Sequence, residues 1–174
     1  MQNQEILTLI RKTKVDALYA MKSYYNASAR YENYNRIVGS FVIALSAIVG
    51  TSIFVSIAKS PELKYKVLAG LLAIAATVLS SLQTFLKFDE RSQNFRIFGN
   101  KFRAIKVKVQ EAEHKYLAGL LNDREAIESA SKLREETSEV IKGAPVISER
   151  DYIKAKNGVK NGESEYTEEE LLKT

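Results

Sequence analysis

Two long uncharged runs dominate the pattern of hydrophobic and polar positions along the chain. They cover residues 37–58 and 67–86 and are separated by the short polar segment 59–66. Each run has about the length that a helix needs to cross the hydrocarbon core of a bilayer, roughly 20 residues. The pattern therefore predicts a transmembrane helical hairpin over residues 37–86.

A soluble protein with two fully buried central helices is the alternative interpretation. The flanking segments carry only one apolar stripe each, so they would not cover both runs. The whole chain is 45% hydrophobic with a mean hydropathy of -0.20, which looks globular because the average mixes apolar runs with charged flanks. We therefore expect an all-α membrane protein.

The polar flanks of the hairpin are also periodic. In residues 1–36, apolar side chains recur at alternating steps of four and three, which predicts one long amphipathic helix. The same steps continue after Leu86 and predict an unbroken helix from Val67 to Leu121. The part of this helix after residue 86 begins a predicted helical stalk of residues 87–142. Facing stripes of this kind pack as long antiparallel helices, and the predicted stalk seam consists of Ala20, Tyr24, Ala27, Phe95, Phe98, Phe102 and Ile105.

The hairpin also predicts a register for the two stripes. If the two ends of the hairpin are level, Tyr24 faces Phe98 and Tyr34 faces Phe88. Along the seam, several large side chains then lie opposite alanines, an arrangement that suits close packing of two helices.

A further helix is predicted after residue 121. Asp123 is the expected N-cap, and the helix covers Arg124–Lys142. Gly143 and Pro145 then end it.

The C-terminal segment, residues 143–174, begins with a second capping signal. Ser148 followed by Asp151 predicts a short helix that ends at Lys156. Asn157-Gly158 and Asn161-Gly162 are typical of turns. The acidic residues 163–174 are expected to form a mobile tail, or to dock on a partner.

Basic residues near the apolar runs predict the orientation of the hairpin. The net charge is +5, and residues 22–36 and 87–106 together contain nine Lys and Arg, against three in the connecting loop. Both termini are therefore expected in the cytoplasm. Membrane lipids are the expected partner of these charges, since anionic head groups attract each by about 1 kcal/mol. No nucleic-acid partner is expected, because no recognition motif accompanies the charge.

Residues suited to catalysis or to metal binding are sparse. The sequence contains no cysteine, and its single histidine, His114, has no second soft ligand nearby. The carboxylates of residues 168–170 lie in the predicted mobile tail, whereas catalytic carboxylates need a rigid pocket. No Gly-rich phosphate loop, catalytic triad or zinc spacing is present. We expect no enzyme, no metal and no cofactor.

Small and hydroxyl side chains gather on one side of each apolar run. They either pack the two helices together or line water between several copies, and Gln83 in particular needs protein or water beside it. Both interpretations remain open, and water lining requires a homo-oligomer. The candidate pore-lining or helix-packing residues are Ala73, Ala76, Thr77, Ser80, Gln83, Thr84, Gly39, Ser46 and Gly50.

Three segments of the chain are similar to those of a known family, namely Leu9-Ile10-Arg11-Lys12-Thr13, Ala44-Leu45-Ser46-Ala47-Ile48-Val49-Gly50 and Ser80-Ser81-Leu82-Gln83-Thr84-Phe85-Leu86. Together with the charged helix that follows them, they resemble the SLATT proteins, two-helix membrane effectors of bacterial conflict systems. The resemblance covers roughly residues 5–140, although Phe95-Arg96 stands where many members have a His-Arg pair.

The resemblance implies an oligomeric, pore-forming effector of anti-phage abortive infection in the bacterial inner membrane. Such an effector would be triggered by an upstream sensor protein or by its nucleotide signal. A trigger of either kind must bind one state of the effector better than the other. A membrane-anchored coiled-coil scaffold without a conducting pore is the competing hypothesis, and a transporter component is a weaker one.

Overall fold

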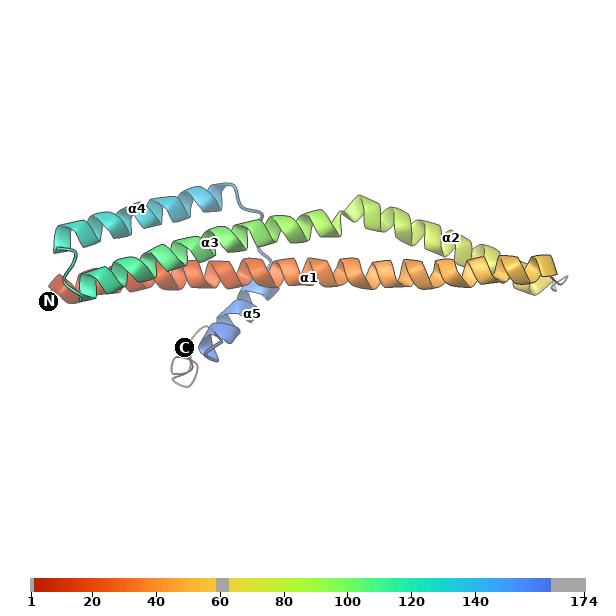
Figure 1. The fold of residues 1–174 in the computed structure, drawn as a ribbon, viewed down its shortest axis with the longest axis horizontal. Coiled ribbons are helices and arrows are strands. Elements are labelled where there is room, and N and C mark those ends of the chain that lie inside the picture. The colour runs from red at the N-terminus through yellow and green to blue at the C-terminus, as the bar shows by residue number, and fades with distance from the viewer. Residues whose placement is uncertain (1, 59–62, 164–174) are drawn as a thin grey trace. The chain divides into compact units, whose positions relative to one another are not determined.

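The computed structural model describes residues 2–58 and 63–163, and the regular structure of these residues is entirely helical. The helices are α1 (Gln2–Ala58), α2 (Leu63–Leu86), α3 (Phe88–Leu117), α4 (Asp123–Lys142) and α5 (Glu149–Lys160) (Figure 1). The prediction of an all-α chain with two long apolar helices is confirmed. The predicted mobile tail lies outside the described residues from residue 164 onward, as does the segment 59–62 of the connecting loop.

The chain divides into two compact units. The polar unit comprises Met1–Ser28 and Gln93–Thr174, and the apolar unit comprises Ala29–Ser92. Helices α1 and α3 contribute residues to both units, whereas α2 belongs to the apolar unit and α4 and α5 to the polar unit. The transitions predicted at residues 36 and 87 from hydropathy lie inside the apolar unit.

The core of the polar unit lies along the side of α1 that faces α3. The aromatic ring of Tyr24 stacks on Phe102, with ring centroids 5.3 Å apart, and also contacts Phe95 and Phe98 at 6.1 and 5.9 Å. All residues of the predicted seam are buried except Ala20, which is half-buried. Two pairs of the predicted register are in ring contact, namely Tyr24 with Phe98 here and Tyr34 with Phe88 in the apolar unit, at 5.9 Å each.

Helix α2 ends at Leu86, so the prediction of an unbroken helix from Val67 to Leu121 is wrong. Lys87 takes a left-handed conformation with φ of 49°, which interrupts the helix at one residue. The ring of Phe88, the first residue after the interruption, lies against Tyr31 and Tyr34 of α1, at centroid distances of 6.4 and 5.9 Å. These aromatic contacts offset the cost of the left-handed residue, which is about 1–2 kcal/mol.

The far end of α3 also comes earlier than predicted. The helix ends at Leu117, and Gly119 follows with φ of 71°, a conformation that suits glycine. Backbone N–H groups of Gly119 and Leu120 donate to Tyr116 O and Lys115 O. A glycine C-cap of this kind satisfies the last carbonyls of the helix, so the signal for termination was Gly119.

Asn122, not Asp123, is the N-cap of α4. The Asn122 side chain accepts from Glu125 N, and the Glu125 carboxylate accepts from Asn122 N at 2.9 Å. This reciprocal pair satisfies two backbone donors, so the helix begins one residue earlier than predicted. The Asp123 carboxylate instead accepts a hydrogen bond from the Tyr116 hydroxyl at 2.8 Å. The predicted end of the helix at Lys142 is confirmed.

Helix α5 begins at the predicted Ser148 cap but runs to Lys160, past the turn expected at Asn157-Gly158. Gly158 is buried, and a Cβ at this position would collide with the carboxylate of Glu163. Packing of the helix thus outweighs the low helix propensity of these two residues. The turn predicted at Asn161-Gly162 is confirmed, since Gly162 has φ of 79°.

Candidate functional site

The apolar unit exposes large hydrophobic side chains along its outer faces. Helices α1 and α2 contain windows with mean hydropathies of 1.4 and 1.8, of which only 0% and 6% is buried. A core helix of a soluble protein would be mostly buried, so these windows are suited to a lipid environment. Six of the exposed apolar residues of α2 recur at helical spacing along one face, namely Val67, Leu71, Ile74, Val78, Leu82 and Phe85.

The inner face of the same unit is closed by a polar contact between α1 and α2. The side-chain amide of Gln83 donates to Asn35 Oδ1 at 2.9 Å. Gly39 lies beside this contact, where a Cβ would be 3.4 Å from Gln83 Nε2. Ala76 is buried on the same face of α2, and Ala73, Gly39 and Gly50 are half-buried. The structure therefore brings Gln83 and Gly39 together in helix packing.

The remaining candidate residues lie on the surface of the apolar unit. Thr77 Oγ1 donates to Ala73 O at 2.9 Å, and Thr84 Oγ1 donates to Ser80 O at 3.1 Å. Hydroxyls bonded to the preceding turn of their own helix are satisfied without a partner outside it. The exposed members of the candidate set, which we call the hydroxyl face, are Ser46, Thr77, Ser80 and Thr84.

Asn35, the partner of Gln83, is not among the residues predicted from the sequence. This residue precedes the first uncharged run and was therefore treated as part of the polar flank. A side-chain amide near a membrane interface is costly without a hydrogen-bond partner, so Gln83 itself indicated that a partner was needed. The identity of that partner depends on the pairing of α1 with α2, which periodicity alone does not give.

The Asn35–Gln83 hydrogen bond is expected to couple the two helices energetically. Replacement of either residue by leucine should destabilise the apolar unit, whereas the double replacement should cost less than the sum of the two. The expected coupling is about 0.6 kcal/mol, with an upper limit near 1.7 kcal/mol, as for other hydrogen bonds between helices in membranes. Thermal unfolding of the four proteins of this cycle in detergent measures it. Additive effects would contradict the hydrogen bond.

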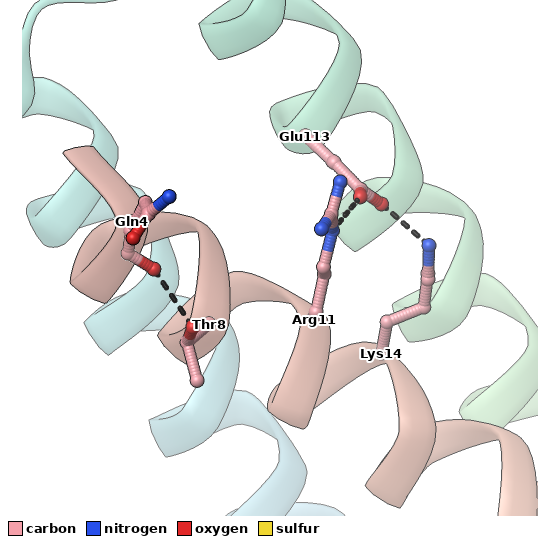
Figure 2. A network of polar contacts seen from close by, with 5 residues as sticks. All are labelled: Gln4, Thr8, Arg11, Lys14 and Glu113. Carbon is pink, nitrogen blue, oxygen red and sulfur yellow. Dashed lines mark hydrogen bonds and ion pairs between the residues drawn. The ribbon is translucent and has the colours of Figure 1, made fainter.

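The polar unit contains a buried carboxylate held by two cations (Figure 2). Glu113 of α3 is 5% exposed and pairs with Arg11 Nε at 2.8 Å and Lys14 Nζ at 2.5 Å, both from α1. Burial is the largest single influence and raises the pKa of Glu113. The hydrogen bonds and charges of Lys14 and Arg11 together outweigh it, so the pKa lies below its ordinary value. This clamp fixes α1 against α3.

The described residues hold no group of three or more His, Cys, Asp or Glu side chains arranged to bind a metal ion. His114 is exposed on α3. Its neighbour Glu111 pairs with Lys115 on the same helix, at 2.7 Å. These groups form a solvated helix surface.

Comparison with known proteins gives one family. The model of the SMODS and SLOG-associating 2TM effector domain family 4 matches residues 6–170. No curated protein and no solved structure matches the chain. The matched range leaves out only residues 1–5 and 171–174, so the match covers essentially the whole chain.

Proposed function

Because the chain belongs to the SMODS and SLOG-associating 2TM effector domain family 4, we propose that it is an oligomeric effector that opens a pore in the bacterial inner membrane. The family is one of two-transmembrane effector domains associated with conflict systems, and the two apolar helices identify a membrane protein. The proposed outcome of pore opening is abortive infection during phage attack.

The observation that carries this proposal is the hydroxyl face. Thr77 and Thr84 are exposed on α2, to one side of the apolar residues that suit lipid. Two helices have no interior of their own, so a polar face on them is best covered by other copies or by water. In a ring of copies, the hydroxyl faces would surround a central passage. This arrangement requires a homo-oligomer, which is therefore part of the proposal.

The proposed topology is multi-pass with both termini in the cytoplasm. In this topology, the first part of α1 and most of α3 form long antiparallel cytoplasmic helices. Basic side chains near the membrane exit would contact anionic lipids. The cytoplasmic helices would receive the trigger from an upstream sensor protein or its nucleotide signal, and no nucleic-acid partner and no enzymatic activity are part of the proposal.

Replacement of Ser80 and Thr84 by leucine tests the pore. In triggered cells the double variant should depolarise the membrane at least about tenfold more slowly, because an apolar constriction excludes water and ions. A membrane-potential dye in cells that produce equal amounts of protein measures this rate. Val78→Leu is the matched control, since it changes the exposed apolar face of the same helix. Equal depolarisation by the double variant would remove the assignment of the hydroxyl face.

A membrane-anchored scaffold is the second candidate, and one observation favours it. Gln83 has a partner within its own chain, and the hydroxyls of Thr77 and Thr84 are satisfied by their own helix. The polar face therefore needs no water to be stable. Absence of depolarisation under any trigger, together with an oligomer in detergent, would favour the scaffold. A monomer in detergent would contradict the proposed pore.

A further inference from the structure

Cationic side chains line one flank of the α1–α3 pair in the polar unit. Lys14 and Lys22 belong to α1, and Arg103 and Lys106 belong to α3. We call these four residues the cation row. Arg103 and Lys106 are three positions apart on α3 and so share a face of the helix. Burial lowers the pKa of Lys106, and the charges of Lys14, Arg103 and Lys22 lower it further, so all three act on this side chain.

The described residues do not supply a carboxylate partner for every member of the cation row. Lys14 shares Glu113 with Arg11, and Lys22 pairs with Glu163 at 2.7 Å. For Arg103 and Lys106 the structure records no carboxylate partner among the described residues. Clustered cations repel one another, so a further anion at this flank would be stabilised.

The Lys22–Glu163 ion pair shows where such an anion enters. Glu163 is the last described residue, and the Lys22 side chain in the pair is only 15% exposed. The backbone of Gly158 allows this approach, because a Cβ there would occupy the place of the Glu163 carboxylate. The chain therefore leaves α5 at the cation row itself.

The sequence that follows Glu163 has the complementary charge. Residues 164–174 contain Glu165, Glu168, Glu169 and Glu170 and a single cation, Lys173. Lys14 lies about 12 Å from Lys22 along α1 at 1.5 Å per residue. An extended chain covers this distance with about four residues, so the segment is long enough to follow the row.

We propose that the acidic segment 164–174 docks on the cation row of its own chain. Glu163 forms the first contact of the docked segment, and the later glutamates neutralise Arg103 and Lys106. The occupant is the chain's own segment because it is already attached at the row, and attachment raises its effective concentration far above that of a free anion. The docking does not depend on whether the protein conducts ions.

Cross-linking in the full-length protein tests the docking. The natural chain has no cysteine, so the reagent links only the introduced thiols. Gln110 is the first position, because it lies between Lys106 and Glu113 at the helical spacing that shares a face. Thr167 is the second position, and Gln110→Cys with Thr167→Cys changes no charge.

The matched control is Ala104→Cys with Thr167→Cys. Ala104 is an exposed residue beside Arg103 and lies two positions from Lys106, so it points to another side of α3. A short bismaleimide should link the 110/167 pair at least about fivefold faster than the control pair, a preference that a few cooperating ion pairs supply. Equal rates for the two pairs would overturn the proposal.

Two conditions identify the cause of the preference. It should disappear in the variant Arg103→Gln/Lys106→Gln and in about 1 M salt, where the Debye length is about 3 Å. A preference that survives both would overturn the electrostatic docking. Mixing chains that carry only one of the two cysteines should give no product, and a covalent dimer would show that the segment docks on a neighbouring copy instead. Circular dichroism confirms that each variant retains its helices.

Discussion

Replacement of Phe102 by alanine should lower the free energy of unfolding of the polar unit by about 3–5 kcal/mol, the usual cost of truncating a buried aromatic side chain. Phe102 has no exposed surface, and its ring is stacked on Tyr24 at 5.3 Å. The change removes this contact and leaves a cavity between α1 and α3. Few single substitutions in this chain are expected to cost more.

Hydrogen exchange of the full-length protein in detergent measures the effect. The amides of residues 13–24 in α1 and 95–109 in α3 should exchange much faster in the variant, because opening of the polar unit becomes more frequent. Ile97→Ala is the matched control, since Ile97 is on the same helix but 52% exposed. Similar acceleration in the two variants would show that the core does not depend on the Tyr24–Phe102 contact.

The second large effect is expected from Glu113→Gln. The variant should be less stable at neutral pH by about 1–3 kcal/mol, because a neutral amide replaces a buried carboxylate that accepts hydrogen bonds from two cations. Arg11 and Lys14 would keep their charges but lose their shared partner. The thermal midpoint of the full-length protein in detergent measures the loss. Glu111→Gln is the control, because Glu111 is exposed and pairs within its own helix, so this change should leave the midpoint in place.

The effect of Glu113 should also depend on pH. Its folded-state pKa is lowered, so the folded protein binds fewer protons at this site than the unfolded chain. The stabilisation is therefore fully present above the ordinary glutamate pKa of about 4.3 and is lost as the pH falls through the lower folded value. The midpoints of wild type and variant should converge on acidification. A difference that persists in acid would contradict the clamp.

The periodicity of the sequence predicted the elements that depend on burial. Spacings of three and four residues locate the seam between α1 and α3, because residues at these spacings lie on the same face of a helix and are buried together. Ala20 satisfies this spacing but is only half-buried. Hydropathy likewise predicted the two apolar helices, since a long uncharged run has few other stable structures.

The polar contacts were not predictable in the same way. The Glu113 clamp joins residues that are 99 and 102 positions apart, and Asn35 and Gln83 are 48 apart. Contacts over such separations depend on the register and rotation of the two helices. An apolar stripe gives the buried face of each helix but defines its register and rotation only to within a residue or two. The break at Lys87 was missed because lysine is a good helix former and carries no termination signal.

The conformation of Lys87 has an energetic consequence for switching. A residue other than glycine holds about 1–2 kcal/mol of strain in the left-handed conformation, and a helical conformation at Lys87 would release it. The neighbouring Phe88 contacts Tyr31 and Tyr34, and each aromatic pair is worth about 0.5–1.5 kcal/mol. A change at Lys87 that moved Phe88 would give up a comparable amount. The two opposing quantities are similar in size, so such a change would be close to neutral in free energy. An agent that binds one conformation of Lys87 about tenfold more tightly than the other would shift the free-energy difference between them by about 1.4 kcal/mol, as much as the strain itself.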